Sequence, residues 1–179
     1  MLSLITGDNP QAFANNITLF DRRKGSGESI WEIKQKIGFF SPELYQYFPL
    51  HTIAVHAVLS GMYDTIGLFK QVSAANRNNA LHWMEIFNIA AESHLPLFQL
   101  SPVQQRMCLV ARAMIKCPSM LILDEPCNGF DQPQKEWLKK LVDTIGYNSK
   151  TTLIFVSHYP YEIPGCVNQY LVLNQGQQV

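Results

Sequence analysis

Two adjacent carboxylates follow a short apolar run near the middle of the chain. Asp124 and Glu125 come directly after Leu121-Ile122-Leu123 and precede Pro126. Two carboxylates at the end of a buried strand are costly unless a positive group lies against them. One can hold Mg²⁺ through water, and its neighbour can orient or deprotonate a water molecule for hydrolysis. The simpler interpretation is a strand that ends in a solvated acidic turn, and this segment alone does not separate the two.

A histidine follows the next apolar run in the same manner. Phe155-Val156-Ser157 leads into His158. The carboxyl ends of parallel strands form the edge of a sheet at which ligands bind, so we expect His158 beside Asp124 and Glu125. A histidine there can donate a hydrogen bond to a phosphate oxygen as charge builds on it. Taken alone, His158 is more simply interpreted as a histidine that faces solvent at the end of a strand. Its position in the order of the other motifs favours the functional interpretation.

Two helices flank the acidic segment, and each has a clear start. Ser101, Pro102 and Gln104 give one helix an N-cap, a proline in its first turn and capping-box spacing. Met107, Val110, Ala111 and Met114 then share one face, and Pro118 ends the helix. Pro133 opens a second amphipathic helix. Its predicted inward residues are Trp137, Leu138, Leu141, Val142 and Ile145, and its predicted outward residues are Lys135, Lys139 and Lys140.

Buried strands alternate with these helices. We expect fully buried strands at 120–123, 151–157 and 170–173, because each is a short, continuous apolar run. Upstream, further strands are expected at 17–20 and 36–40, a short helix capped by Ser29 and Glu32, and helices over 52–62 and 78–92. This alternation predicts a layered α/β domain with a largely parallel sheet. Residues 16–40 are more strand-and-turn in character, and residues 43–100 are mainly helical.

Composition excludes several classes of protein. The chain has 179 residues, of which 47% are hydrophobic and 16% charged, so a folded globular protein is expected. Lys and Arg total 14 and Asp and Glu total 14, and this balance argues against a nucleic-acid-binding surface. No apolar run approaches the roughly 20 residues that a membrane-spanning helix needs.

The order of these motifs resembles that of the ATP-binding-cassette (ABC) ATPases over almost the whole chain. Leu100 to Arg106 stands where that family has its Leu-Ser-Gly-Gly-Gln signature. Residues 122–126 resemble the Walker B motif, residues 128–131 (Asn-Gly-Phe-Asp) the D-loop, and His158 the switch histidine. The segments 3–20 and 25–31 are similar to a molybdate-transport or photorepair-type subgroup. The resemblance implies a three-layer P-loop NTPase fold, with a small β-rich N-terminal part and a helical subdomain over about 43–100. Residues 101–179 would then carry the signature helix, Walker B, D-loop and switch histidine of one ABC-type domain spanning 1–179.

The resemblance also implies roles for individual residues. Asp124 would bind Mg²⁺ through water, Glu125 would be the general base, and His158 would sense the γ-phosphate. Ser101 and Gln104 occupy nucleotide-contacting positions of the signature, and Asp131 would communicate across a dimer. The implied ligands are ATP and Mg²⁺. The implied partners are a second ABC subunit and membrane permease subunits, with a cytoplasmic location at the inner face of the membrane.

Three departures from the family pattern point the same way. The sequence contains no Gly-x-x-x-x-Gly-Lys-Ser/Thr loop, which would supply the backbone N–H groups and lysine that hold phosphates. Pro102 and Val103 replace two glycines of the signature; proline has no N–H, and valine adds bulk where a phosphate would approach. Ser41-Pro42-Glu43 stands where a glutamine is expected after the strand at 36–40. We therefore expect a chain that starts just after its phosphate loop, through truncation or a mis-started reading frame.

Three functions remain open at this point. The complete gene product hydrolyses ATP as a dimer, which the retention of Glu125 favours. Alternatively, the chain is a degenerate, non-catalytic cassette that pairs with a competent ABC subunit, as Pro102, Val103 and the missing loop suggest. It could also be a gene fragment without function. In each case the chain by itself is expected to bind ATP weakly or not at all.

Overall fold

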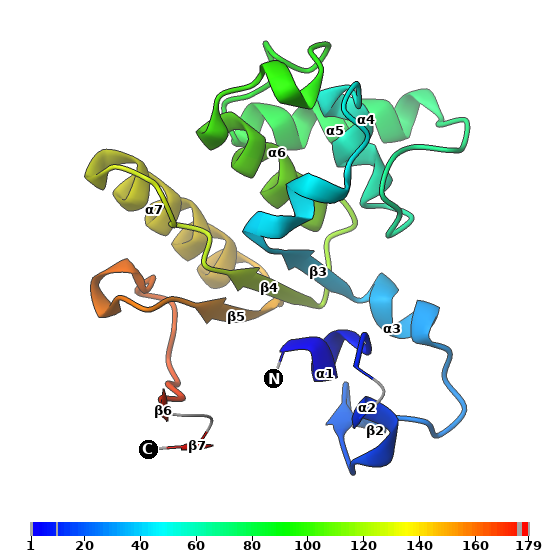
Figure 1. Cartoon of the computed structure of the whole chain (residues 1–179), viewed down its shortest axis with the longest axis vertical. Coiled ribbons are helices and arrows are strands. Elements are labelled where there is room, and N and C mark those ends of the chain that lie inside the picture. The colour runs from blue at the N-terminus through cyan, green and yellow to red at the C-terminus, as the bar shows by residue number, and fades with distance from the viewer. Residues whose placement is uncertain (1, 10, 175–176, 179) are drawn as a thin grey trace.

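The computed structural model describes residues 2–9, 11–174 and 177–178 (Figure 1). Its centre is a three-stranded parallel sheet in the order β3-β4-β5. The strands are β3 (Ile37–Phe40), β4 (Met120–Asp124) and β5 (Thr152–Val156). Met120 is the register partner of Ile37 on one side and of Thr152 on the other. All three strands therefore end at the same edge of the sheet.

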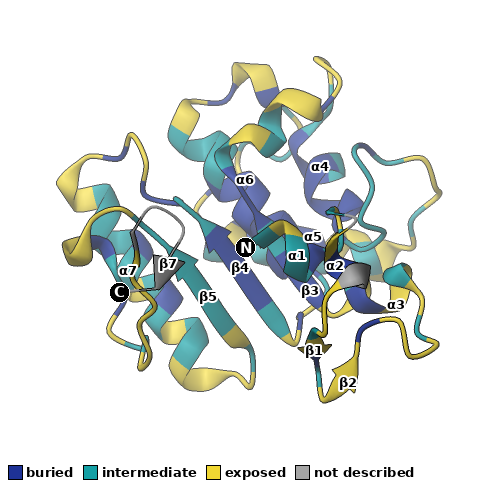
Figure 2. Cartoon of the chain, turned by 60° about the horizontal axis from the view of Figure 1, so that its bottom comes forward, coloured by how far each residue is buried: buried dark blue, intermediate teal, exposed yellow. Residues whose placement is uncertain are grey.

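The central strand β4 is covered on both faces, as its unbroken apolar sequence predicts. Leu121 and Leu123 face the larger core, which they share with α6 (Pro102–Met114) and α7 (Gln132–Asn148). Ile122 faces a smaller core together with Ile33 and Ile37. Leu2 and Ile5 of α1 (Leu2–Thr6) pack against that smaller core, which lies between the sheet and α3 (Ile30–Gln35). The chain is thus an α/β protein with helices on both faces of a parallel sheet (Figures 1 and 2).

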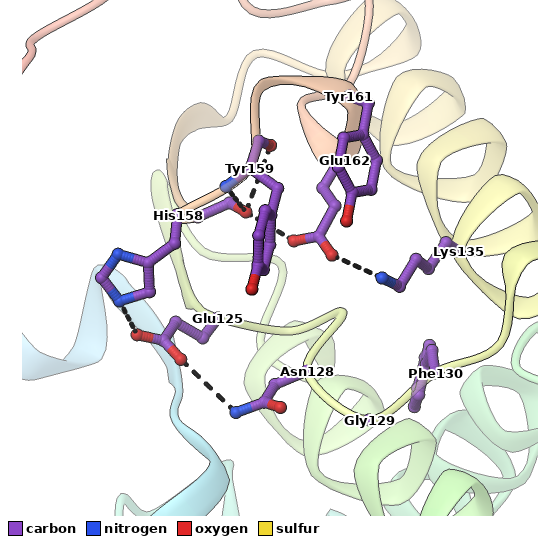
Figure 3. Close-up of a pocket in the computed structure, with 10 residues that line it drawn as sticks. Glu125, Asn128, Gly129, Phe130, Lys135, His158, Tyr159, Tyr161 and Glu162 are labelled. Carbon is purple, nitrogen blue, oxygen red and sulfur yellow. Dashed lines mark hydrogen bonds and ion pairs between the residues drawn. The ribbon is translucent and has the colours of Figure 1, made fainter.

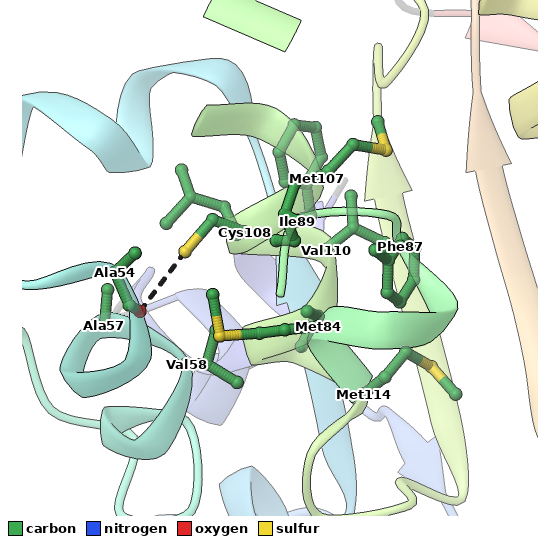
Figure 4. Packing of buried hydrophobic residues seen from close by; sticks show 14 of the residues in the cluster. Ala54, Ala57, Val58, Met84, Phe87, Ile89, Met107, Cys108, Val110 and Met114 are labelled. Atoms are coloured by element: carbon green, nitrogen blue, oxygen red, sulfur yellow. Dashed lines mark hydrogen bonds between the residues drawn. The ribbon is translucent and has the colours of Figure 1, made fainter. Parts of the chain in front are cut away.

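The segment between β3 and α6 is built of helices and 3-10 turns. It contains η1 (Pro42–Tyr47), α4 (Ala54–Ser60), α5 (Ala74–Ile86) and η2 (Leu97–Gln99). Figure 4 shows how tightly α4 and α6 pack: the Cys108 thiol on α6 lies 3.4 Å from the carbonyl oxygen of Ala54. The helix expected at 78–92 begins and ends earlier than predicted. Phe87 caps it, and Asn88 takes a left-handed backbone (φ 54°) that a helix cannot continue through.

The N-terminal part contains α2 (Gln11–Ala14) and an antiparallel hairpin of β1 (Thr18–Leu19) and β2 (Arg22–Arg23). The strand expected at 17–20 is shorter, because Phe20 and Asp21 both adopt positive φ to make the tight turn. The capping box at Ser29 and Glu32 is present at the start of α3, as predicted.

The C-terminal part differs most from the sequence prediction. The segment 170–173 is not a buried strand: Tyr170 is 68% exposed, and Leu171 and Val172 lie outside any strand. Only Leu173 joins a strand, β6 (Leu173–Asn174), which pairs with β7 (Gln177–Gln178) in a separate hairpin. Among the described residues β5 pairs with β4 alone, so its side chains are half-buried or exposed rather than fully buried. Both differences have one cause: no strand of the described chain lies on the far side of β5.

Within the described part of the chain, no helix is both long and apolar enough to traverse a bilayer.

Candidate functional site

The candidate site lies where β4 and β5 end. Asp124 is the last residue of β4 and Glu125 follows it, while Ser157 and His158 follow β5. The His158 Nε2 atom is 2.8 Å from Glu125 Oε1 (Figure 3). The structure therefore brings the acidic segment and the histidine to one edge, as the parallel arrangement predicts.

The backbone at Glu125 is held in an uncommon conformation. Its φ is 47°, in the left-handed region that non-glycine residues rarely occupy. Its N–H donates to the Val156 carbonyl at 3.0 Å, and its own carbonyl accepts from the Asn128 N–H at 3.2 Å. These bonds fix the turn after β4 to the end of β5, and such strain is concentrated at functional sites.

Negative charge accumulates around Asp124. Burial is the largest factor that raises its pKa above the ordinary value, and the charges of Glu125 and Glu43 raise it further; His158 acts in the opposite direction. A bound cation would relieve this cost. Within the described residues no three His, Cys, Asp or Glu side chains are grouped to hold a metal, and Mg²⁺ commonly uses only one or two carboxylates together with substrate phosphates. The donor set at Asp124 fits that mode of binding.

A cavity of about 390 Å³ opens beside Glu125 and His158. The residues that line it come from the turn after β4, the start of α7, the segment after β5, and η3 (Pro160–Glu162). They are Glu125, Asn128, Gly129, Phe130, Lys135, Ser157, His158, Tyr159, Tyr161 and Glu162.

The contacts of Lys135 and Lys139 with η3, beside this cavity, were not predicted from the sequence. Lys135 and Lys139 were expected to face outward, but only Lys140 does. Lys135 Nζ lies 2.8 Å from Glu162 Oε1, and Lys139 Nζ donates to the Tyr161 carbonyl at 2.9 Å. The η3 turn folds over the start of α7 and covers both lysines. No local pattern connects positions 27 residues apart, as Lys135 and Glu162 are, so periodicity could not have identified the pair.

Ser101 and Gln104 lie outside the cavity and form the cap of α6. Ser101 Oγ accepts from the Gln104 N–H, and Gln104 Oε1 accepts from the Ser101 N–H at 2.9 Å. The remaining amide group of Gln104 donates to Glu92 Oε1 at 2.9 Å. Pro102 occupies the first turn, and Val103 packs against the main core. In this chain, the polar groups of the segment are engaged in holding the helix.

Asp131 likewise has a local partner. Its Oδ1 accepts from the Gln134 N–H at 2.9 Å, and the pair forms the capping box of α7. The loop before it is fastened to α6 by Arg106, which donates to the Asn128 carbonyl and lies over the Phe130 ring at 5.3 Å. Gly129 has φ 75° and faces the Arg106 guanidinium, so a side chain there would be strained and crowded. The sequence placed Arg106 at the end of the signature-like segment but gave it no role.

These features of fold and site define an ABC-type nucleotide-binding cassette, and comparisons with known proteins agree. The model of the ABC transporter family matches residues 1–128. The chain is 40% identical over 172 residues to the ABC transporter ATP-binding protein ModF of Escherichia coli, covering 96% of this chain and 35% of that protein. It is 31% identical to an uncharacterized ABC transporter ATP-binding protein of Schizosaccharomyces pombe, covering 100% of this chain and 37% of that protein.

The chain belongs to the ABC transporter family. It also resembles the molybdate import ATP-binding protein MolC of Haemophilus influenzae, at 24% identity over 80% of this chain and 56% of that protein. Among solved structures, cbiO1 of Clostridium perfringens, part of the cbiONQ transporter complex, aligns with a TM-score of 0.72 at 20% identity. That alignment covers 90% of this chain and 62% of cbiO1, and it supports the fold. The chain spans little more than a third of the length of ModF and of the fission yeast relative.

Proposed function

We propose that this chain supplies the hydrolytic acids and switch histidine of an ATP-hydrolysing ABC cassette. The observation that carries the proposal is the 2.8 Å contact between His158 Nε2 and Glu125 Oε1 at the carboxyl ends of two parallel strands. A carboxylate held there can accept a proton from an attacking water molecule, and the histidine can orient that carboxylate. The retention of both residues in one contact favours hydrolysis over binding alone.

Asp124 would hold Mg²⁺ through water, since burial and two neighbouring carboxylates concentrate negative charge on it. When bound with ATP, Mg²⁺ neutralises charge on the phosphate oxygens. Glu125 would then act as general base, and His158 would donate from its ring to the γ-phosphate. Ser101 and Gln104 would contribute to nucleotide binding by fixing the start of α6, and Asp131 by fixing the start of α7 toward a second subunit.

The proposed assembly is a dimer of ABC subunits. In support, a neighbour at TM-score 0.66 and 18% identity is an ATP-binding cassette solved as a dimer with ADP and Pi. A transport role with membrane permease subunits, and a cytoplasmic location at the inner face of the membrane, is proposed by analogy with the relatives ModF and MolC. Residues 1–179 would form one ABC-type domain, with a helical subdomain over about 43–100 and the motifs over 101–179.

The test is the Mg²⁺-dependent ATPase rate of a form that carries a phosphate-binding loop segment ahead of residue 1. Glu125→Gln should lower kcat by about 10²-fold or more, because the amide cannot accept the proton. The Kd for ATP should stay within about threefold, since the carboxylate acts on water and not on ground-state nucleotide. Glu85→Gln, at an exposed acid on α5, is the matched control and should retain the parent rate. Parent-like kcat in Glu125→Gln would remove Glu125 from the role of base.

A second function is favoured by the start of α6. Pro102 has no N–H to offer a phosphate, and Val103 is committed to the core. A cassette built this way could pair with a competent ABC subunit without hydrolysing ATP at its own signature. In that case the loop-bearing form binds ATP but shows no turnover above that of Glu125→Gln.

A further inference from the structure

Among the described residues, the ion-pair partner of the His158 side chain is Glu125. The side chain is 77% exposed, and its ring meets Glu125 Oε1 through Nε2. An exposed side chain with a single ion-pair partner gains little orientation from that pair alone, because solvent screens it and rotamer entropy opposes it. Its direction must therefore depend on the backbone on either side, at Ser157 and Tyr159.

The Ser157 hydroxyl organises that backbone. Its oxygen accepts from the Tyr159 N–H at 3.0 Å, which closes a turn around His158. Its single hydrogen can go to Glu162 Oε2 at 2.5 Å or to the Tyr159 carbonyl at 3.4 Å. The shorter bond to a carboxylate is the stronger one. The Ser157 hydroxyl therefore accepts a hydrogen bond from the Tyr159 N–H and donates one to the Glu162 carboxylate.

Glu162 is a buried, charged anchor for this turn. The residue is only 4% exposed, and its second oxygen, Oε1, lies 2.8 Å from Lys135 Nζ. Burial acts to raise the pKa of Glu162, but the hydrogen bonds from Lys135 and Ser157 outweigh it and hold the pKa below the ordinary value. Removing one member of such a network leaves a buried polar group unpaired.

Lys135 carries the connection to α7. It is the fourth residue of that helix, four positions after the Asp131 cap, and its Nζ lies 5.3 Å from the centre of the Tyr161 ring. The Lys139 bond to the Tyr161 carbonyl fastens the same turn one helical turn further on. The network thus runs from Lys135 of α7 through Glu162 and Ser157 to the backbone N–H of Tyr159, the residue after His158. Figure 3 shows Lys135, Glu162, Tyr159 and His158 around the cavity.

We propose that Lys135, Glu162 and Ser157 are positioning residues that hold the His158 ring against Glu125. The proposal concerns the geometry of the pair; its consequence for ATP hydrolysis rests on the proposed function. None of the three residues touches Glu125 Oε1. They act through the backbone of the turn, so their loss should separate His158 from Glu125 without altering either side chain.

The test follows the His158 ring by NMR in the chain itself, without ATP. The ring Cε1–H resonance of His158 is measured at one fixed pH and assigned among the five histidines with His158→Gln. Glu125→Gln replaces the partner carboxylate with a neutral amide and should shift this resonance in the parent chain. The same substitution is then repeated in Ser157→Thr, Ser157→Val and Glu162→Gln backgrounds. Threonine and valine are nearly isosteric, and only threonine keeps the hydroxyl.

In the Ser157→Thr background, Glu125→Gln should shift the His158 resonance as much as it does in the parent chain. In the Ser157→Val and Glu162→Gln backgrounds, the same substitution should shift it much less. Glu136→Gln, at an acid that contacts Lys139 but not Lys135, is the control and should leave the shift intact. An equal shift in all backgrounds, or equal losses with threonine and valine, would overturn the positioning role. These outcomes are independent of the ATPase test, so the proposed function can fail while this inference stands, and the reverse.

Discussion

At the scale of single residues, Asp124 and Glu125 share one edge but have different surroundings. Glu125 has a direct partner in His158, whereas Asp124 lies among other carboxylates. Two neighbouring acids with different environments are suited to different tasks. The unrelieved charge suits a cation ligand, and the hydrogen-bonded acid suits proton transfer.

Asp124→Asn should stabilise the chain in the absence of Mg²⁺. The pKa of Asp124 is raised in the folded state, chiefly by burial and then by Glu125 and Glu43, so its charged form opposes folding. The contribution of Asp124 is fully favourable below its ordinary pKa of 3.8 and is lost as pH rises through the raised value. The gain in unfolding free energy should therefore be present at pH 7 and shrink as the pH falls toward 3.8.

Urea denaturation of the parent and variant across this pH range checks the prediction. Asp21→Asn is the matched control, since Asp21 is an exposed turn residue with φ 61°, which asparagine also tolerates. A loss of stability in Asp124→Asn at pH 7, or a gain that grows toward low pH, would contradict the electrostatic account.

Some residues of the site could be predicted from sequence and others could not, depending on whether their position follows from a local pattern or from a fold-back of the chain. Asp124, Glu125 and His158 could be predicted from sequence because each follows an apolar strand, and strand ends meet in a parallel sheet. Glu162 could not, because its burial depends on a turn folding back over α7. The positions of Asp131 and Ser101 at helix starts could also be predicted from sequence. In the structure both side chains act as N-caps of their helices.

At the scale of elements, the helix starts that carry a capping box were predictable from sequence, whereas the incomplete burial of β5 was not. The caps of α3 and α6 lie at Ser29 and Ser101, because capping is a contact within four residues. Burial of β5 depends on which segments lie beside it in space, and apolar sequence cannot report that. The prediction of a buried strand at 170–173 was wrong for the same reason, because an apolar run forms a strand only where a partner strand exists.

Ser101→Ala should lower the unfolding free energy by about 1 kcal/mol, because the first turn of α6 loses its side-chain acceptor. The measurement is chemical denaturation at neutral pH. Ser26→Ala, in the exposed turn before α3, removes a hydroxyl that caps no helix and should change stability by less than about 0.5 kcal/mol. Equal effects of the two substitutions would show that the cap at α6 carries no stability.

At the scale of the whole molecule, the chain contains the acids, the histidine and the signature helix but not the loop that cradles phosphates. The α/β class, the parallel sheet and the order of its motifs were predictable from sequence. The three-layer arrangement follows from helices on both faces of β4. The chain spans little more than a third of the length of its ABC relatives ModF and the fission yeast protein.

Mg²⁺–ATP should bind this chain with a Kd weaker than about 1 mM, equivalent to less than ~4 kcal/mol. Without the backbone donors and lysine of a phosphate loop, the contacts that hold a triphosphate are missing from the chain. Isothermal titration calorimetry with and without Mg²⁺ measures this directly. Micromolar affinity for the chain alone would require a nucleotide site other than the one described.

The central claim is that Glu125 and His158 act as one unit on ATP, and a double-mutant cycle on kcat tests it most directly. In the loop-bearing form, Glu125→Gln and His158→Ala should each lower kcat by about 10²-fold or more. The double variant should lose little beyond the larger single effect, because residues that act as a unit are not additive. A double variant whose loss equals the product of the two single losses, or a single variant with the parent rate, would contradict the account.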